Sequence, residues 1–278
     1  MAVDSIANAG GKGANQAVQA ARMGAKTIFV GRVGADPFGR QLIETLCAYG
    51  VGMNCVAVDQ TSPSGMAVVI VEDDGSNRIV VVPGANGAVG EAELKMLDDL
   101  LEPGSVLSLQ CEIPFGIVRE AARCGRRKGA TVLLDPSPAQ AIVLSPGVFD
   151  NVDYLMPNEG EACALSGERD VFAAARTLLR FGARTVVVKM GEKGAMAVGA
   201  YESSPVSAFN VAVQDTTGAG DSFQGAFAAS LDYGYDPERA LRRAMAAGAL
   251  TVTKLGAQQA MPSGSEVDAF LQSQPCKG

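Results

Sequence analysis

The sequence predicts an α/β protein in three layers, with a largely parallel central sheet that helices cover on both faces. Two patterns indicate this fold class. Short runs of β-branched apolar residues alternate along the chain with longer amphipathic stretches, and such alternation is typical of βαβ units. One region, residues 55–82, breaks the alternation and predicts a small appended β structure.

Apolar runs predict the buried strands of the sheet. Val, Ile and Leu dominate them, as expected where both faces of a strand are covered. We expect strands at residues 27–30, 106–109, 131–134, 154–156 and 185–189. Apolar residues spaced three and four apart predict the covering helices. We expect helices at residues 14–23, 38–49, 117–128, 171–181, 220–231 and 237–252.

Residues 55–82 contain β-rich runs and no helical pattern. The runs at 55–58, 66–71 and 78–82 surround turn-forming residues at 73–77, which favours antiparallel hairpins. We interpret residues 55–82, together with residues 1–9, as a small β lid within a single domain that spans residues 1–278. The lid is rich in valine, which either packs against a second copy of the chain or covers a ligand.

Composition excludes several classes of function. The net charge of −7 disfavours binding to nucleic acids and anionic membranes. The absence of histidine excludes His-based triads and His metal ligands. No apolar run reaches the roughly 20 residues of a membrane helix, and the amino end does not resemble a signal peptide. The six cysteines form no CxxC pair, so we expect reduced thiols and a cytoplasmic protein.

The segment 215–223, DTTGAGDSF, precedes an apolar helix. Its small residues allow a sharp turn that leaves the amides of Gly218, Ala219 and Gly220 free at the helix amino terminus, where the dipole favours an anion. Asp221 stands beside these donors and is suited to take the proton of an attacking hydroxyl group. The alternative is an aspartate that only caps the helix behind a glycine turn.

A second glycine-rich segment, GGKGANQA at residues 10–17, alone indicates no more than a loop before a helix. Together and in this order, the two segments resemble the pfkB family of sugar kinases, and GGKGANQA resembles the ribokinases within that family. The resemblance extends from Gly10 to about Leu271. It implies a ribokinase-like fold and transfer of the γ-phosphoryl group of ATP to the 5-hydroxyl of D-ribose. No GxxxxGK[ST] P-loop is present, so the glycine turn must hold the phosphates.

The resemblance also implies the residues of a sugar site. It places Gly11, Lys12 and Asn15 against the sugar hydroxyls, with Asp221 as the catalytic base. Glu112 follows a predicted strand, at the edge of the sheet where α/β folds bind ligands. This position matches a family glutamate that reaches the sugar, although an exposed loop glutamate is equally compatible with the pattern.

ATP and magnesium residues are implied in the same way. Asn158 and Glu161 match an N-x-x-E element in which the Asn approaches the phosphates and the Glu holds Mg²⁺ through water. The alternative is a helix cap with an acid in the first turn. The resemblance also places Lys189, Gly191 and Gly194, at the turn after a predicted strand, and Gly220 of the segment 215–223 against ATP. Relatives more often have Thr at the position of Lys189.

A monovalent cation, usually K⁺, is a further implication of the resemblance. Its ligands would be the Asp215 carboxylate and main-chain carbonyl groups of Thr217, Thr251, Lys254 and Gly256. Relatives often add a hydroxyl group at the position of Ala260, which alanine cannot supply. Potassium dependence is therefore less strongly implied than magnesium dependence.

The amino end departs from the family pattern. Relatives begin with a strand inside the sheet, an Asn/Asp turn that grips the sugar and a strand of the lid, whereas this chain offers only residues 1–9 there. We therefore expect an amino-truncated form with impaired activity. The resemblance further implies a homodimer formed through the lids. The alternatives are another acceptor, such as fructose, 2-keto-3-deoxygluconate or a nucleoside, and a non-catalytic nucleotide-binding protein.

Overall fold

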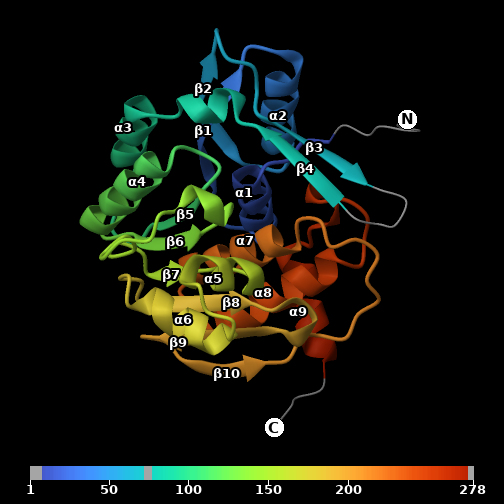
Figure 1. The fold of residues 1–278 in the computed structure, drawn as a ribbon. Helices are drawn as coiled ribbons and strands as arrows, with labels where there is room; N and C mark the ends of the chain where they lie inside the picture. The colour runs from blue at the N-terminus through green and yellow to red at the C-terminus, as the bar shows by residue number, and fades with distance from the viewer. Residues whose placement is uncertain (1–7, 72–76, 275–278) are drawn as a thin grey trace.

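The computed structural model describes residues 8–71 and 77–274, and its largest element is a six-stranded sheet (Figure 1). The strand order is β10-β9-β8-β7-β6-β5. Neighbours from β5 to β8 are parallel, and these strands are β5 (Val106–Gln110), β6 (Thr131–Asp135), β7 (Tyr154–Leu155) and β8 (Thr185–Lys189). At the other edge, antiparallel pairing adds β9 (Ala195–Gly199) and β10 (Ser203–Val206). The expected largely parallel sheet is confirmed.

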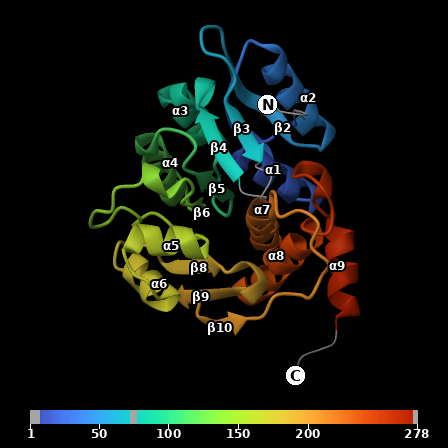
Figure 2. The same ribbon diagram turned by 45° about the vertical axis from the view of Figure 1, so that its right-hand side comes forward.

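Helices cover both faces of this sheet and make the three expected layers (Figure 2). One face packs against α4 (Phe115–Lys128), α5 (Glu159–Ser166) and α6 (Val171–Leu179), with α3 (Glu91–Leu100) against α4. The other face packs against α7 (Ala219–Asp232) and α8 (Pro237–Thr251), with α1 (Lys12–Arg22) against α7 and α9 (Gly264–Ser273) against α8. Successive residues of β8 explain the layering, because Val186 and Val188 pack on the first face and Val187 packs on the second.

Most expected elements are present with shifted ends. The expected strand at 27–30 is observed as β1 (Ile28–Gly34), and the expected helix at 38–49 as α2 (Pro37–Ala48). The sequence analysis assigned no range to α3, α5, α9, β9 and β10. Short 3₁₀ turns are η1 (Gly84–Ala88), η2 (Ala139–Ala141), η3 (Gly191–Lys193) and η4 (Gln258–Ala260). In the described part of the chain, no helix combines the length and apolarity needed to cross a membrane.

Two further small sheets lie beside the six-stranded sheet (Figure 1). β3 (Met66–Val71) and β4 (Asn77–Val82) form the expected antiparallel hairpin. The strand expected at 55–58 belongs to β2 (Gly52–Asp59) and pairs parallel to β1, so the expectation of an antiparallel hairpin there was wrong. The reason is the connection, because α2 joins the two strands as a crossover helix and parallel pairing requires one. Residues 1–7 of the proposed lid, and residues 73–76 of its turn, lie outside the described residues.

β1 is not part of the six-stranded sheet, although its sequence indicates a strand of the main sheet. β1 pairs with β2 on one edge, and β5 pairs with β6 on one edge. Within residues 8–71 and 77–274, no strand pairs with the other edge of either. Side chains pack between the two sheets here, since Val30 packs against the core that contains Leu107 and Leu109.

Candidate active site

The amino terminus of α7 forms a turn of small residues near the carboxyl end of β8. Gly218 adopts a φ of 75°, which favours glycine, and precedes the first helical residue without a side-chain cap. Within the described chain, the amides of Gly218 and Gly220 make no hydrogen bond. The amide of Ala219 donates to the carbonyl oxygen of Thr216 at 3.2 Å, so the expectation that all three amides are free was wrong for Ala219.

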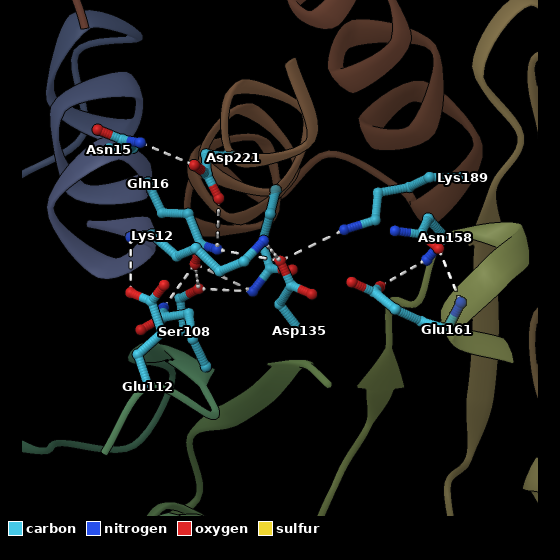
Figure 3. A network of polar contacts seen from close by, with 12 residues as sticks. Lys12, Asn15, Gln16, Ser108, Glu112, Asp135, Asn158, Glu161, Lys189 and Asp221 are labelled. Atoms are coloured by element: carbon cyan, nitrogen blue, oxygen red, sulfur yellow. Dashed lines mark hydrogen bonds and ion pairs between the residues drawn. The ribbon is translucent and has the colours of Figure 1, made fainter. Parts of the chain in front are cut away.

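Asp221 lies in the first turn of α7 and is only 6% exposed. Nδ2 of Asn15 donates to its Oδ2 at 2.8 Å, and Nε2 of Gln16 donates to its Oδ1 at 3.4 Å (Figure 3). Burial raises the pKa of Asp221, while Lys12 and the Asn15 hydrogen bond act in the opposite direction. A buried carboxylate with a raised pKa is a better proton acceptor than an exposed one.

Lys12 and Glu112 meet at the start of α1. The Lys12 amide donates to Oε2 of Glu112 at 2.9 Å, which brings the first segment against the end of β5. Burial alone would lower the pKa of Lys12, but surrounding carboxylates, first of all Asp135 and Asp221, raise it. Burial raises the pKa of Glu112. The structure thus places both predicted sugar residues beside Asp221, and Glu112 is not a freely exposed loop residue.

Asp135 is a site residue that the sequence analysis missed. It is the last residue of β6 and is completely buried. Its Oδ2 lies 3.7 Å from Nζ of Lys12 and 3.4 Å from Nζ of Lys189, whereas Oδ1 has no hydrogen-bond partner in the described residues. An acidic residue that ends an otherwise apolar strand was the signal that could have revealed it.

Gln16 is the second missed residue, and it connects the acidic groups (Figure 3). Its Nε2 donates at 3.4 Å both to Asp135 and to Asp221. Its Oε1 accepts hydrogen bonds from the side chains of Ser108, Gln110 and Gln224. Asn15 is tied in the same way, since its Oδ1 accepts from Gln258 at 3.1 Å. The helix α1 is therefore fixed against both the sheet and α7 at this edge.

Asn158 and Glu161 form a reciprocal cap at the start of α5. Oδ1 of Asn158 accepts from the Glu161 amide at 2.8 Å, and Oε2 of Glu161 accepts from the Asn158 amide at 2.9 Å. These two hydrogen bonds confirm that Asn158 and Glu161 cap a helix. The cap also places the Glu161 carboxylate on the side of Lys12, whose pKa it helps to raise.

Lys189, the last residue of β8, lies beside the glycine turn of α7. Nζ of Lys189 lies 3.8 Å from the point where a Cβ atom on Gly220 would stand. Gly191 and Gly194 have φ values of 57° and 98°, and the space beside Gly191 is open. The neighbouring Lys193 instead pairs with Glu159 at 3.0 Å on the surface.

The predicted cation residues lie in two adjoining segments. Oδ1 of Asp215 accepts from the amide and hydroxyl of Thr217, and Oδ2 accepts from the Gly256 amide at 2.8 Å. These hydrogen bonds lower the pKa of Asp215. The carbonyl oxygen of Thr251 accepts from the Lys254 amide at 3.2 Å. The structure brings the segments around Asp215 and Gly256 together but already uses both Asp215 oxygen atoms.

Comparison with known proteins identifies the family of the chain. Residues 7–264 match the family described as pfkB family carbohydrate kinase. The chain belongs to the pfkB family. A ribokinase from Schizosaccharomyces pombe is 39% identical over 272 residues, which cover 93% of this chain and 85% of that protein. As a carbohydrate kinase, the protein is a phosphotransferase with an alcohol group as acceptor.

Solved structures of pfkB relatives share the fold over most of their length. Ribokinase from Thermotoga maritima has a TM-score of 0.84 and 40% identity, covering 95% of this chain and 88% of that chain. Arabidopsis thaliana ribokinase, complexed with ribose and ATP, has a TM-score of 0.85 and 34% identity, with the same coverage. The expected ribokinase-like fold is confirmed.

Proposed function

We propose that the protein is an ATP-dependent ribokinase that phosphorylates the 5-hydroxyl group of D-ribose. The observation that carries the proposal is the position of Asp221, a buried carboxylate three residues beyond Gly218 and beside two free amides at the amino terminus of α7. A helix amino terminus with free N–H groups attracts a phosphoryl group, and the carboxylate next to it can accept the proton of the attacking hydroxyl.

In the proposed mechanism, Asp221 takes the proton from the sugar hydroxyl as its oxygen attacks the γ-phosphorus. Asn15 and Gln16 hold the Asp221 carboxylate in place through its two oxygen atoms. The amides of Gly218 and Gly220 and the ammonium group of Lys189 stabilise the negative charge of the transferring group. We assign Gly11, Lys12 and Glu112 to the sugar, and Asn158, Gly191 and Gly194 to ATP.

Mg²⁺ fits the carboxylates of Glu161 and Asp135. Glu161 leaves Oε1 outside its capping bond, and the buried Oδ1 of Asp135 has no partner in the described residues. Mg²⁺ keeps several waters and needs only one or two protein carboxylates beside the substrate phosphates. We propose that Glu161 holds it through water, with Asp135 nearby. The ion would neutralise charge on the transferring phosphoryl group.

K⁺ is proposed for the loop of Asp215, Thr217, Thr251, Lys254 and Gly256. The fit is weaker there, because both Asp215 oxygen atoms already accept hydrogen bonds and Ala260 adds no hydroxyl group. Turnover in equal concentrations of potassium and choline chloride tests the proposal. Equal rates in the two salts would remove K⁺ from the mechanism.

We further propose that residues 55–82 act as a lid within one kinase domain and that the lids join two copies. Val68, Val80, Val81 and Val82 are between 44% and 60% exposed on the β3–β4 hairpin, an unusual run of exposed apolar side chains. Val81→Glu should shift the protein to monomer in sedimentation at micromolar concentration. Val143→Glu, at a site that is 81% exposed in the connection after η2, is the control.

Phosphate transfer from labelled ATP to a panel of acceptors tests the main proposal. The panel contains ribose, fructose, 2-keto-3-deoxygluconate and a ribonucleoside. We expect ribose to have the highest kcat/KM. A higher value for another acceptor would replace ribose as the substrate, and ATP binding without transfer to any acceptor would contradict the catalytic role.

A further inference from the structure

Gln258 places a buried amide group beside Asn15. It is the first residue of η4 and is 2% exposed, so its amide group must find its partners within the protein. Nε2 of Gln258 donates to Oδ1 of Asn15 at 3.1 Å, whereas its Oε1 has no hydrogen-bond partner in the described residues. A buried acceptor without a partner destabilises the folded state. Packing alone would favour an apolar side chain here, so the donor points to a role beyond packing.

The hydrogen bond continues from Asn15 to Asp221 (Figure 3). Nδ2 of Asn15, a residue that is 7% exposed, donates to Oδ2 of Asp221 at 2.8 Å. An ionised carboxylate only accepts hydrogen bonds, so Asn15 must turn its nitrogen toward Asp221 and its oxygen away. That oxygen is the atom that accepts from Gln258. The three side chains therefore form one chain in which each donor points toward the carboxylate.

The donor of Gln258 bears on the orientation of the Asn15 amide. The two ends of a side-chain amide have nearly the same shape, so shape alone hardly selects which end faces Asp221. With the donor of Gln258 in place, a reversed amide would bring two N–H groups together and turn its oxygen against the carboxylate. The donor also polarises the Asn15 amide, which strengthens the hydrogen bond at its other end.

Contacts on either side of η4 hold Gln258 in place. Before the turn, the amide of Gly256 donates to Oδ2 of Asp215 at 2.8 Å. After the turn, the carbonyl oxygen of Pro262 accepts from Nε2 of Gln19 at 3.0 Å, and Gln19 is a completely buried residue of α1. The same helix carries the side chain that accepts from Gln258. Donor and acceptor therefore belong to elements that are fixed to each other.

We propose that Gln258 is a positioning residue that keeps the Asn15 nitrogen turned toward the carboxylate of Asp221. The importance of this contact for catalysis rests on the proposed role of Asp221 as the base. Charged groups also act on this carboxylate, and they are Lys12 of α1, Glu112 after β5, Asp135 of β6 and Lys189 of β8. Among the described residues, none of these four hydrogen-bonds to Gln258, so a change at Gln258 leaves their charges in place.

The test is a titration of Asp221 by ¹³C NMR in the whole chain labelled with ¹³C-aspartate, in which Asp221→Asn identifies the signal. The Asn15 hydrogen bond lowers the pKa of Asp221, so a weaker bond should raise the titration midpoint. Gln258→Met keeps the length of the side chain but removes the donor, and we expect the midpoint to rise by about 0.5–1 pH unit. Gln259→Met, at an exposed neighbour on the same turn, is the matched control and should leave the midpoint unchanged.

Further measurements separate positioning from a structural role. In the Asn15→Ala background, Gln258→Met should move the midpoint no further, because Gln258 acts only through Asn15. The melting temperature should change little, since Gln258→Met also removes an acceptor that has no partner in the described chain. In steady-state kinetics, kcat/KM should fall about three- to tenfold below the midpoint and stay within about twofold above it. Gln258→Leu is a second apolar variant and should behave alike.

An unmoved midpoint in Gln258→Met, or an equal rise in Gln259→Met, would overturn the inference. A full second rise in the Asn15→Ala background would do the same, because Gln258 would then act on Asp221 by another route. Loss of the melting transition in both Gln258→Met and Gln258→Leu would assign Gln258 to folding instead. The NMR readouts need no turnover, so they are independent of the proposed ribokinase activity. A midpoint that rises while the acidic limb of kcat/KM stays in place would show that Asp221 is not the base and would remove the catalytic role of Gln258 with it.

Discussion

Nζ of Lys189 lies 3.4 Å from Oδ2 of Asp135, a completely buried carboxylate that also attracts Lys12. The pair joins the ends of β6 and β8, and Lys189 lies next to the glycine turn of α7. The carboxylate thus holds a cation beside the free amide of Gly220 without contacting that amide itself. We therefore expect Asp135 to position this lysine for the phosphate contact that the proposed mechanism assigns to it.

Removal of this lysine should weaken ATP binding. Lys189→Met deletes a charge-assisted contact of about 1.5–3 kcal/mol, so we expect KM for ATP to rise roughly ten- to a hundredfold. Lys193→Met is the control, because its exposed pair with Glu159 is of a kind worth about 0–1 kcal/mol. Steady-state kinetics with varied ATP measures both. Similar KM values for the two variants would contradict the phosphate contact.

Replacement of the proposed base should remove catalysis while sparing nucleotide binding. Asp221→Asn keeps the shape of the side chain but cannot accept the proton, and we expect kcat to fall about 10²–10⁴-fold. Calorimetric ATP affinity should stay nearly unchanged. Asp232→Asn, at the far end of the same helix, is the control for helix integrity. A loss in kcat of less than about tenfold would show that another group is the base.

The pH profile should report the environment of Asp221. The base works deprotonated, and burial raises its pKa, so kcat/KM should fall as pH is lowered through that raised pKa. The Asn15 hydrogen bond lowers the pKa, so Asn15→Ala should raise the pKa further and move the acidic limb to higher pH. A limb that stays in place or moves to lower pH in Asn15→Ala would contradict this assignment.

Glu161 can be tested for a metal role separately from its capping role. Glu161→Gln keeps an acceptor for the Asn158 amide but loses the charge, so the melting temperature should change little. The Mg²⁺ concentration that gives half-maximal activity should rise. Asn158→Ala is the comparison, because it removes a cap and should cost about 1 kcal/mol of stability. If Glu161→Gln leaves the Mg²⁺ dependence unchanged, Glu161 is only a cap.

Gly194 should be indispensable for the fold of the turn after β8. Its φ is 98°, and a Cβ atom would stand 1.8 Å from the carbonyl oxygen of Val206. Gly194→Ala should therefore lower the free energy of unfolding by about 3 kcal/mol or more, as measured by urea denaturation. Gly191→Ala meets open space at a φ of 57° and should cost only about 1 kcal/mol. Equal losses would contradict the steric cause.

The local pattern of the sequence was enough to predict most helices and strands and the glycine turn of α7. The run of three valines in β8 and the segment at 215–223 carry their information in neighbouring residues, so an apolar run and turn chemistry suffice to locate them. The capping residues Asn158 and Glu161 were likewise visible, because a cap depends on residues three positions apart.

Only the tertiary structure decided which distant residues meet. Asp135 and Lys189 end different strands, and Gln16 reaches both Asp135 and Asp221 from α1, contacts that no local pattern encodes. The bond between Ala219 and Thr216 and the parallel pairing of β1 with β2 also depended on the folded chain. Local residue choice determines the type of each element, whereas contacts between distant segments depend on how the elements pack around a common core.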